Sequence, residues 1–362
     1  MNILFLTGGL NYADGVTSHL YNLICGLSEN NELELHLLYS GGEAAEKFNL
    51  PSVRLTLNKN LRHKSRSIVN FSKAYFDIKK YCLKNDIDIV HSHNHYAANI
   101  AGRAAAKLKA GTVQTIHGLI PEGGRLRHFF ADKYISLNNK ITDHLILSNI
   151  SKREDIFNIR QGIPEKNLFR KKLFQGSGSE NIPVILYASR LIKEKGCDVF
   201  IKAAAEVRKN TGKELKFIIA GSGEYESELK SLSENLNAGI EFKGSVKDIF
   251  KVMRNADIFV STTGMSSEGF PMTVAEAAFS GCLIISSRQS WLTEVFEEER
   301  DGLCYSVGDH IELAERIFQS LENKEESQRM AELYQDKATQ IFSIGVMTEI
   351  HKKLYKECLT GK

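Results

Sequence analysis

Short apolar runs alternate with segments of helix length along almost the whole chain. The runs are bounded by Gly, Asn or Ser, and the segments between them carry apolar residues at three- and four-residue spacing. This alternation is typical of βαβ units, and it predicts an α/β fold with largely parallel sheets. We expect strands near residues 3–6, 33–38, 87–91, 113–116 and 145–147, and then near 184–188, 217–220, 240–242, 258–260 and 283–286.

The length of 362 residues favours two domains, because single hydrophobic cores rarely grow beyond about 250–300 residues. The stretch 161–183 has a linker composition, with lysines and a Gly-Ser-Gly-Ser run at 176–179. We therefore expect one domain over 1–165 and a second over 166–340. A last helix near 346–359 follows the apparent end of the second domain, and we expect 341–362 to cross back to the first.

Composition and charge exclude several classes of protein. The chain is 42% hydrophobic and 25% charged, which is typical of a folded globular protein. The 47 Lys and Arg against 44 Asp and Glu leave a net charge of +3, which gives no support for nucleic-acid binding. The six cysteines lie far apart, without zinc or disulfide spacing, and no signal peptide pattern or membrane-spanning run is visible. These features predict a cytoplasmic protein.

Two glycine-containing turns follow predicted strands, where open parallel sheets bind their ligands. The first includes Gly9, Gly15 and Val16, and its N–H groups and the following helix would suit a phosphate. The second includes Gly221 and a further glycine two residues later. Neither has the spacing of a dinucleotide fingerprint. A flexible turn explains the first equally well, and a helix cap formed by residue 222 or 223 explains the second.

Two cations follow the first strand of the second domain. At the carboxyl end of that strand, Arg190 offers a planar guanidinium group and Lys195 offers a compact ammonium charge. Together they could neutralise a diphosphate, which is what a nucleotide leaving group requires. Surface cations on a loop are the alternative interpretation.

Residues 268–278 form the most distinctive local pattern. Pro271 suits the first turn of a helix, and a glycine at 281 suits its end. The N–H groups of Gly269 and Phe270 would then suit sugar hydroxyls or phosphate, while Glu268 and Glu276 could accept from hydroxyl pairs. Two solvated charges near a helix are the alternative.

Histidines occur at two strand ends. His117 follows the strand 113–116, where it lies either at a ligand site or against a neighbouring loop. His91, His93 and His95 alternate along the chain, as metal ligands on one strand face would. No carboxylate or cysteine lies at ligand spacing nearby, so we expect no metal site here.

Taken together, these motifs resemble the retaining nucleotide-sugar glycosyltransferases of the GT-B fold, specifically glycosyltransferase family 4 (glycosyl transferases group 1). The resemblance covers essentially the whole chain. It rests on Gly8-Gly9 with Gly15-Val16, Asp88-Ile89-Val90-His91-Ser92-His93, Thr115-Ile116-His117-Gly118, Ser189-Arg190 with Lys195-Gly196, Ala220-Gly221-Ser222-Gly223, and Glu268 with Glu276-Ala277-Ala278.

The resemblance implies two Rossmann-like, doubly wound parallel-sheet domains facing a central cleft. It also implies that Arg190 and Lys195 hold the donor diphosphate, that Glu276 binds the nucleotide ribose, and that Glu268 and His117 lie near the transferred sugar.

The remaining donor-site residues come from the same resemblance. The backbone of Gly269, Phe270 and Pro271 would lie against the donor sugar, and the segment 242–246, which ends at Val246, would run beside the base. The loop of Gly9, Gly15 and Val16 would face phosphate and acceptor, and the turn at Gly221 would belong to the donor side.

The expected activity is transfer of a hexose-type sugar, with retention, from a nucleotide-sugar to a glycan or lipid-linked acceptor, in polysaccharide or glycolipid biosynthesis. A UDP-sugar is favoured over a GDP-sugar, and no cofactor or metal is required. A GT-B epimerase or phosphorylase, a nucleotide-sugar-binding module without catalysis and a dinucleotide-dependent oxidoreductase are the alternatives. Two segments depart from the family pattern: 160–164, before the linker, and 288–291, where a glycine pair is usual.

Residues 54–80 are strongly basic, with eight Lys or Arg against one Asp. Ile68, Phe71, Tyr75, Ile78 and Cys82 recur at helical spacing, as in a basic amphipathic helix. One interpretation is a helix packed on its own sheet with a solvated basic face. The other is peripheral contact with an anionic membrane at its inner face, or with a lipid-linked acceptor.

Overall fold

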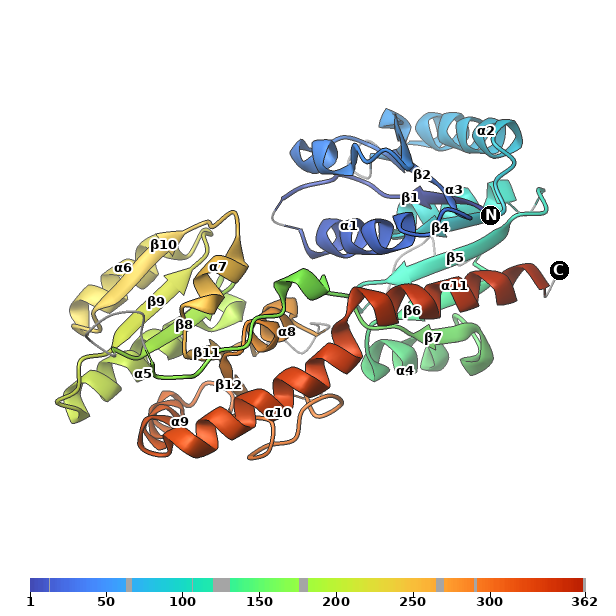
Figure 1. The fold of residues 1–362 in the computed structure, drawn as a ribbon. Coiled ribbons are helices and arrows are strands. Elements are labelled where there is room, and N and C mark those ends of the chain that lie inside the picture. The colour runs from blue at the N-terminus through green and yellow to red at the C-terminus, as the bar shows by residue number, and fades with distance from the viewer. Residues whose placement is uncertain are drawn as a thin grey trace. The chain divides into compact units, whose positions relative to one another are not determined.

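The computed structural model describes residues 1–12, 14–62, 67–105, 107–119, 131–175, 182–264, 270–289 and 292–360. The chain forms two compact units. Unit 1 comprises Met1–Gly162 and Phe342–Lys362, and unit 2 comprises Ile163–Ile341. Each unit is built on one parallel sheet with helices packed on it (Figure 1).

The sheet of unit 1 has, in the described residues, seven parallel strands in the order β3-β2-β1-β4-β5-β6-β7. The strand order reverses between β1 and β4, and ligands bind at such a point in open α/β sheets. The strands are β1 (Asn2–Leu6), β2 (Glu34–Tyr39), β3 (Val53–Leu57), β4 (Ile89–Ser92), β5 (Gly111–Ile116), β6 (Lys133–Ser136) and β7 (Ile156–Asn158).

Helices cover both faces of this sheet. Ile3 and Phe5 of β1 pack in a core with α1 (Gly15–Ser28) and α11 (Ile344–Thr360). Leu4 and Leu6 point to the other face, where the core includes residues of α2 (Ile68–Lys84) and α3 (His95–Ala105). A continuous apolar run such as β1 is therefore what a strand buried on both faces requires. Between β6 and β7 lies α4 (Asn139–Leu147).

Unit 2 repeats this architecture. Its sheet has, in the part of the chain described, six parallel strands in the order β10-β9-β8-β11-β12-β13, with the reversal between β8 and β11. The strands are β8 (Val184–Ala188), β9 (Lys216–Ala220), β10 (Ile240–Gly244), β11 (Ile258–Ser261), β12 (Leu283–Ser287) and β13 (Leu303–Tyr305). The helices are α5 (Cys197–Asn210), α6 (Glu226–Asn235), α7 (Ile249–Arg254), α8 (Met272–Phe279), α9 (His310–Glu322) and α10 (Lys324–Phe342).

The expected strands coincide with or overlap observed ones, except for 145–147, which is wrong. These residues end α4, whose first turn is capped by Asn138 through a 2.8 Å bond from the N–H of Ile141. Leu145 is buried while Leu147 is exposed, so the run follows a helical period and was too short to distinguish from a strand. Four further strands, β3, β6, β7 and β13, were not predicted from the sequence.

The basic amphipathic segment forms α2, but its buried stripe differs from the expected one. Ile78 and Cys82 are buried, and Phe71 and Tyr75 pack against the core. Ile68 is wrongly placed on this face, because it is 88% exposed at the first turn. None of the helices in the described residues has the length and apolar character needed to cross a membrane.

Candidate functional site

In unit 2, the turn that carries Lys195 is fixed at the reversal point of the sheet. Lys195 ends a short 3-10 turn after β8 and is 8% exposed. Its backbone carbonyl accepts from the hydroxyls of Thr262 (2.8 Å) and Tyr187 (3.2 Å). Gly196 follows in a left-handed conformation (φ 68°), and a Cβ there would lie 2.6 Å from the Thr262 carbonyl. The turn after β8 is therefore held against the end of β11.

Arg190 lies exposed on the same loop, close to the second glycine turn. The N–H of Leu191 donates to the Ser222 carbonyl (3.0 Å), so the two loops are in direct backbone contact. Gly221 has a φ of 147°, and a Cβ there would lie 1.9 Å from the Ser189 carbonyl. The glycine turn thus permits a close approach that supports the Arg190 loop.

The cap interpretation of this turn is wrong. Helix α6 begins at Glu226, and Tyr225 occupies its N-cap position, so neither Ser222 nor Gly223 caps it. A Cβ on Gly223 would lie 2.1 Å from the Leu191 carbonyl, so this glycine also serves the contact between the loops.

Helix α8 begins where the sequence predicts, with Pro271 at the N-cap and Gly281 following its C-terminus at a φ of 74°. Glu276 lies in the second turn of this helix, and burial raises the pKa of its carboxyl to about 7. Phe270 and Pro271 are described and half-buried, whereas Glu268 and Gly269 lie outside the described residues. The structure therefore places Glu276, the expected ribose ligand, and two of the four residues expected beside the donor sugar, Phe270 and Pro271.

Val246, half-buried, follows β10 at the edge of the sheet. In the segment that departs from the family pattern, Arg288 forms ion pairs with Glu298 (2.7 Å) and Glu312 (3.0 Å). Gln289 donates to the Thr263 carbonyl (3.3 Å), and residues 290 and 291 lie outside the described residues. Arg288 is therefore committed to a structural network.

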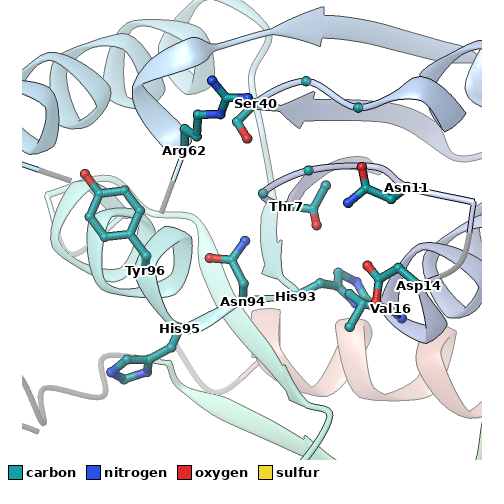
Figure 2. A pocket seen from close by; sticks show the side chains of 14 residues that line it. Thr7, Asn11, Asp14, Val16, Ser40, Arg62, His93, Asn94, His95 and Tyr96 are labelled. Atoms are coloured by element: carbon teal, nitrogen blue, oxygen red, sulfur yellow. Dashed lines mark hydrogen bonds between the residues drawn. The ribbon is translucent and has the colours of Figure 1, made fainter. Parts of the chain in front are cut away.

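In unit 1, a cavity of about 620 Å³ lies at the reversal point between β1 and β4. Figure 2 shows Asn11 and Asp14 on one side of this space, Arg62 and Tyr96 on the other, and Asn94 between them. Such side chains suit hydroxyl groups and one negative charge. The lining residues are Thr7, Gly8, Gly9, Asn11, Asp14, Val16, Ser40, Gly41, Gly42, Arg62, His93, Asn94, His95 and Tyr96.

The first glycine turn enters α1 through Asp14, which was not among the expected site residues. Its carboxylate accepts from the N–H of Val16 (3.2 Å) and the hydroxyl of Thr17 (3.1 Å). The N–H of Val16 is therefore already paired, and a phosphate at this helix end would meet a like charge. Gly15 begins the helix, and Gly9 pairs with Gly41 beside β2. This turn favours a hydroxyl ligand over a phosphate.

His117 follows β5 and belongs to a cluster of histidines. Its Nε2 lies 3.3 Å from Nδ1 of His93, and its ring is perpendicular to that of His19, with centroids 5.0 Å apart. Burial lowers the pKa of His117 to about 4, so the ring is neutral at pH 7. His19 from α1 and His351 from α11 were missed by the sequence analysis, because both are remote from the 91–95 run.

His91 has a structural role in this cluster. Its Nδ1 contacts the hydroxyl of Tyr355 on α11 (2.7 Å), and its Nε2 contacts the hydroxyl of Thr115 (2.8 Å). His95 instead begins α3 and lines the cavity. The three alternating histidines thus have three different environments.

A second cavity, of about 520 Å³, is lined by Ser40, Gly41, Leu57, Lys59, Asn60, Arg62 and Asn70. It shares Ser40, Gly41 and Arg62 with the first cavity. The two spaces therefore adjoin, with the cationic side chain of Arg62 at their border and that of Lys59 in the second cavity.

Comparison with known families gives one match for each unit. Residues 13–163 match the model of Glycosyltransferase Family 4, and residues 169–336 match the model of Glycosyl transferases group 1.

Individual relatives match at low identity. An N,N'-diacetylbacillosaminyl-diphospho-undecaprenol alpha-1,3-N-acetylgalactosaminyltransferase of Campylobacter jejuni is 25% identical over 311 residues, which cover 78% of this chain and 80% of that protein. A GalNAc-alpha-(1->4)-GalNAc-alpha-(1->3)-diNAcBac-PP-undecaprenol alpha-1,4-N-acetyl-D-galactosaminyltransferase of the same organism is 28% identical over 150 residues. That second match spans only 41% of either chain.

Among solved structures, Anabaena Alr3699/HepE in complex with UDP-glucose has a TM-score of 0.80 and 20% identity, with 100% of both chains covered. This likeness extends over both units and confirms the predicted GT-B fold.

Proposed function

We propose that this chain, a glycosyltransferase of the GT-B type, transfers a hexose-type sugar from a nucleotide-sugar to a glycan or lipid-linked acceptor with retention of configuration. The two Campylobacter relatives carry undecaprenol-linked acceptors in their names, and HepE was solved with UDP-glucose. These relatives favour a UDP-sugar donor, with a GDP-sugar as the second candidate, and a role in glycolipid or polysaccharide biosynthesis.

The observation that carries the proposal is the rigid cationic loop after β8. Lys195 is largely shielded from water, so a diphosphate beside it would interact under weak solvent screening. Its backbone is fixed by Thr262 and Tyr187, and the Arg190 loop is fixed by the glycine turn at Gly221. Cations held in place before the reaction stabilise the charge that develops on a leaving diphosphate. Arg190 and Lys195 would therefore bind and activate the leaving group.

Glu276 and the start of α8 complete the donor side. A carboxylate beside a ribose accepts from both ring hydroxyls, and we assign this role to Glu276. Glu268, with the backbone of Gly269, Phe270 and Pro271, would lie against the donor sugar. Val246 would contact the base.

Retention is proposed to proceed by attack of the acceptor on the same face from which the diphosphate departs. The acceptor hydroxyl then loses its proton to a leaving-group phosphate oxygen. His117 would assist by hydrogen bonding to the transferred sugar, since its ring is neutral at pH 7. Because Arg190 and Lys195 supply positive charge at the diphosphate, we propose that donor binding needs no metal ion.

The acceptor side is assigned to the two adjoining cavities of unit 1. Asn11, Asp14 and Asn94 offer amide and carboxylate partners for sugar hydroxyls. Arg62 and Lys59, at the border and in the second cavity, would bind the phosphate of a lipid-linked acceptor.

Helix α2 supports membrane contact by unit 1. Its outer face carries Val69 (60% exposed), Phe76 (65%) and Leu83 (62%) at seven-residue spacing, with Lys73 and Lys80 exposed between them. A merely solvated face would not need apolar side chains, whereas an interfacial helix combines them with cations. We propose peripheral binding to the inner face of an anionic membrane from the cytoplasm.

Thermal shift with UDP, GDP, ADP and their sugar conjugates tests the proposal. We expect one base to raise Tm by about 2–5 °C, because a ligand that binds the folded state stabilises it. Arg190→Ala and Lys195→Ala should lose this shift and turnover. Lys193→Ala, which removes an exposed lysine from the same turn, should keep both.

Two outcomes would redirect the assignment. If no nucleotide raises Tm, the result would indicate that the chain binds no nucleotide-sugar. A nucleotide-dependent shift without release of nucleoside diphosphate in the presence of acceptors would favour an epimerase or a binding module. The anomeric configuration of a transferred sugar, read by NMR, separates retention from inversion.

A further inference from the structure

Three histidines from different elements of unit 1 converge at the carboxyl ends of β4 and β5. His19 comes from α1, His93 follows β4 and His117 follows β5. One ring nitrogen from each lies within 4.8 Å of the other two. These residues are distant in sequence, so the fold alone brings them together.

The ring nitrogens of this cluster are poorly satisfied. Neither nitrogen of His19 has a hydrogen-bond partner among the described residues, and the same holds for Nε2 of His93. Both side chains are buried, at 0% and 2% exposure. The contact between Nδ1 of His93 and Nε2 of His117 can hold one proton between the two rings, but it provides no partner for the two nitrogens of His19 or for Nε2 of His93. Buried polar atoms are almost always paired in folded proteins, so His19, with both ring nitrogens unpaired, requires a further partner.

We propose that His19, His93 and His117 form a binding site for one Zn²⁺ ion in unit 1. Zinc in proteins prefers imidazole and thiolate ligands, whereas Mg²⁺ and Ca²⁺ prefer oxygen. No cysteine or carboxylate belongs to the cluster found in the described residues, so a His₃ set results.

The geometry fits this ion. Two nitrogens that bind one tetrahedral zinc at about 2.0–2.1 Å lie roughly 3.3 Å apart. Nδ1 of His93 and Nε2 of His117 are 3.3 Å apart already. One nitrogen of each ring lies within 4.8 Å of the other two, so a tetrahedral site requires the rings to approach by up to about 1.5 Å.

The protonation state fits as well. Burial lowers the pKa of His19 and of His93, and of His117 to about 4. All three rings are therefore neutral at pH 7, the form that binds a metal. Metal binding at pH 7 therefore does not have to compete with formation of the imidazolium ion.

The site is accessible from the large cavity, because His93 also lines that space. An ion would approach from the cavity, and a water molecule there would occupy the fourth position. The ion would join α1 to the ends of β4 and β5 and stabilise unit 1. It takes no part in binding the donor diphosphate, which is assigned to unit 2, and it leaves the second nitrogen of His117 available to a sugar.

Metal titration of the chelator-treated full chain tests the proposal without any assay of transfer. We expect one equivalent of Co²⁺ to bind with the visible absorption bands of a four-coordinate ion, and Zn²⁺ to displace it. Excess Zn²⁺ should raise Tm by about 5 °C. His93→Asn and His117→Asn should lose the bands and the Tm rise.

Matched variants keep the test decisive. His310→Asn removes a half-buried histidine of α9 in unit 2 and should bind Co²⁺ like the wild type. His117 is half-buried, so its variant should fold, as a circular dichroism melt would verify. Absence of the bands in the wild type, or wild-type binding by both His93→Asn and His117→Asn, would overturn the site. Neither result would bear on nucleotide binding, so the zinc site and the proposed transferase function fail independently.

Discussion

The hydroxyl of Thr262 donates to the backbone carbonyl of Lys195 over 2.8 Å, and this bond joins the end of β11 to the turn after β8. Thr262 is 2% exposed, so the bond is protected from water. The position of the lysine is thus determined partly by a residue 67 positions later in the chain.

Replacement of Thr262 by valine should weaken donor binding while the protein still folds. The carbonyl of Lys195 would keep only the Tyr187 hydroxyl, and a lost hydrogen bond is worth about 1 kcal/mol. We expect KM for the donor to rise about fivefold to tenfold. Thr262→Ser, which keeps the hydroxyl, should restore the wild-type KM. Equal kinetics for the two variants would show that the bond does not position the lysine.

Replacement of Gly221 by alanine should destabilise unit 2. Its φ of 147° is unfavourable for alanine, and the new Cβ would meet the Ser189 carbonyl at 1.9 Å. We expect a loss of at least about 2 kcal/mol in the free energy of unfolding, measured by urea denaturation. Gly212→Ala is the matched control, because nothing lies within 4 Å of its Cβ position and its φ is not positive. A similar stability for both variants would contradict the close approach.

The stability of the ligand-free protein should respond to pH through Glu276. Its folded-state pKa of about 7 lies above the usual glutamate value of 4.5, so the folded state retains a proton that the unfolded state has lost between these pH values. Stability therefore falls as pH rises from 4.5 to 7 and stays lowered above. At pH 8, Glu276→Gln should be more stable than wild type by about 2 kcal/mol, with allowance for partial exposure.

The same comparison at pH 4 should give no difference, because the wild-type carboxyl is then protonated in both states. Glu315→Gln, an exposed glutamate of α9, should show no gain at either pH. A gain for Glu276→Gln that is independent of pH would indicate better packing rather than removal of a buried charge.

Donor affinity should follow the ionisation of the same carboxyl. The ionised form accepts from both ribose hydroxyls, and the ionised fraction falls about tenfold from pH 8 to pH 6 for a pKa of about 7. We expect the Kd for the nucleoside diphosphate to rise by a similar factor in the wild type and much less in Glu276→Gln. The ratio of the wild-type Kd to the variant Kd at each pH cancels the titration of the nucleotide phosphate, because that titration affects both proteins equally. Parallel pH profiles would rule out Glu276 as the ribose ligand.

Binding to anionic vesicles should depend on the outer face of α2. Phosphatidylglycerol vesicles at low salt should sediment the wild type, while Lys73→Glu/Lys80→Glu should bind at least about tenfold more weakly, since each basic residue contributes about 1 kcal/mol. Phe76→Ser/Leu83→Ser should also bind weakly. The control Lys353→Glu/Lys356→Glu reverses two exposed charges on α11. Equal binding by this control and the α2 variants would dismiss a specific membrane face.

The sequence was sufficient to predict the strand that precedes Arg190 and Lys195, because a continuous apolar run buried on both faces has few other interpretations. It could not predict Thr262 as a partner of Lys195. That contact depends on β11 pairing directly with β8, although β9 and β10 intervene in the chain. Strand order is set by the packing of the whole sheet, and short motifs carry little information about it.

The histidine cluster was missed for the same reason. The run from His91 to His95 suggested partners at strand spacing, whereas the fold pairs His93 with residues from α1 and from the loop after β5. The error at 145–147 has a local cause, since three apolar residues fit one turn of a helix as well as a strand.

Helix α11 gives unit 1 a late step in its folding during synthesis. Tyr355 of this helix contacts His91, and the core around β1 and β5 includes Leu354 and Cys358. These residues leave the ribosome only after all of unit 2, whereas the strands that they cover are made first. Unit 2 is continuous in sequence and can fold as it emerges. Until α11 has been synthesised, one apolar face of the sheet of unit 1 is incompletely covered. The part of the protein that is synthesised first is therefore completed last.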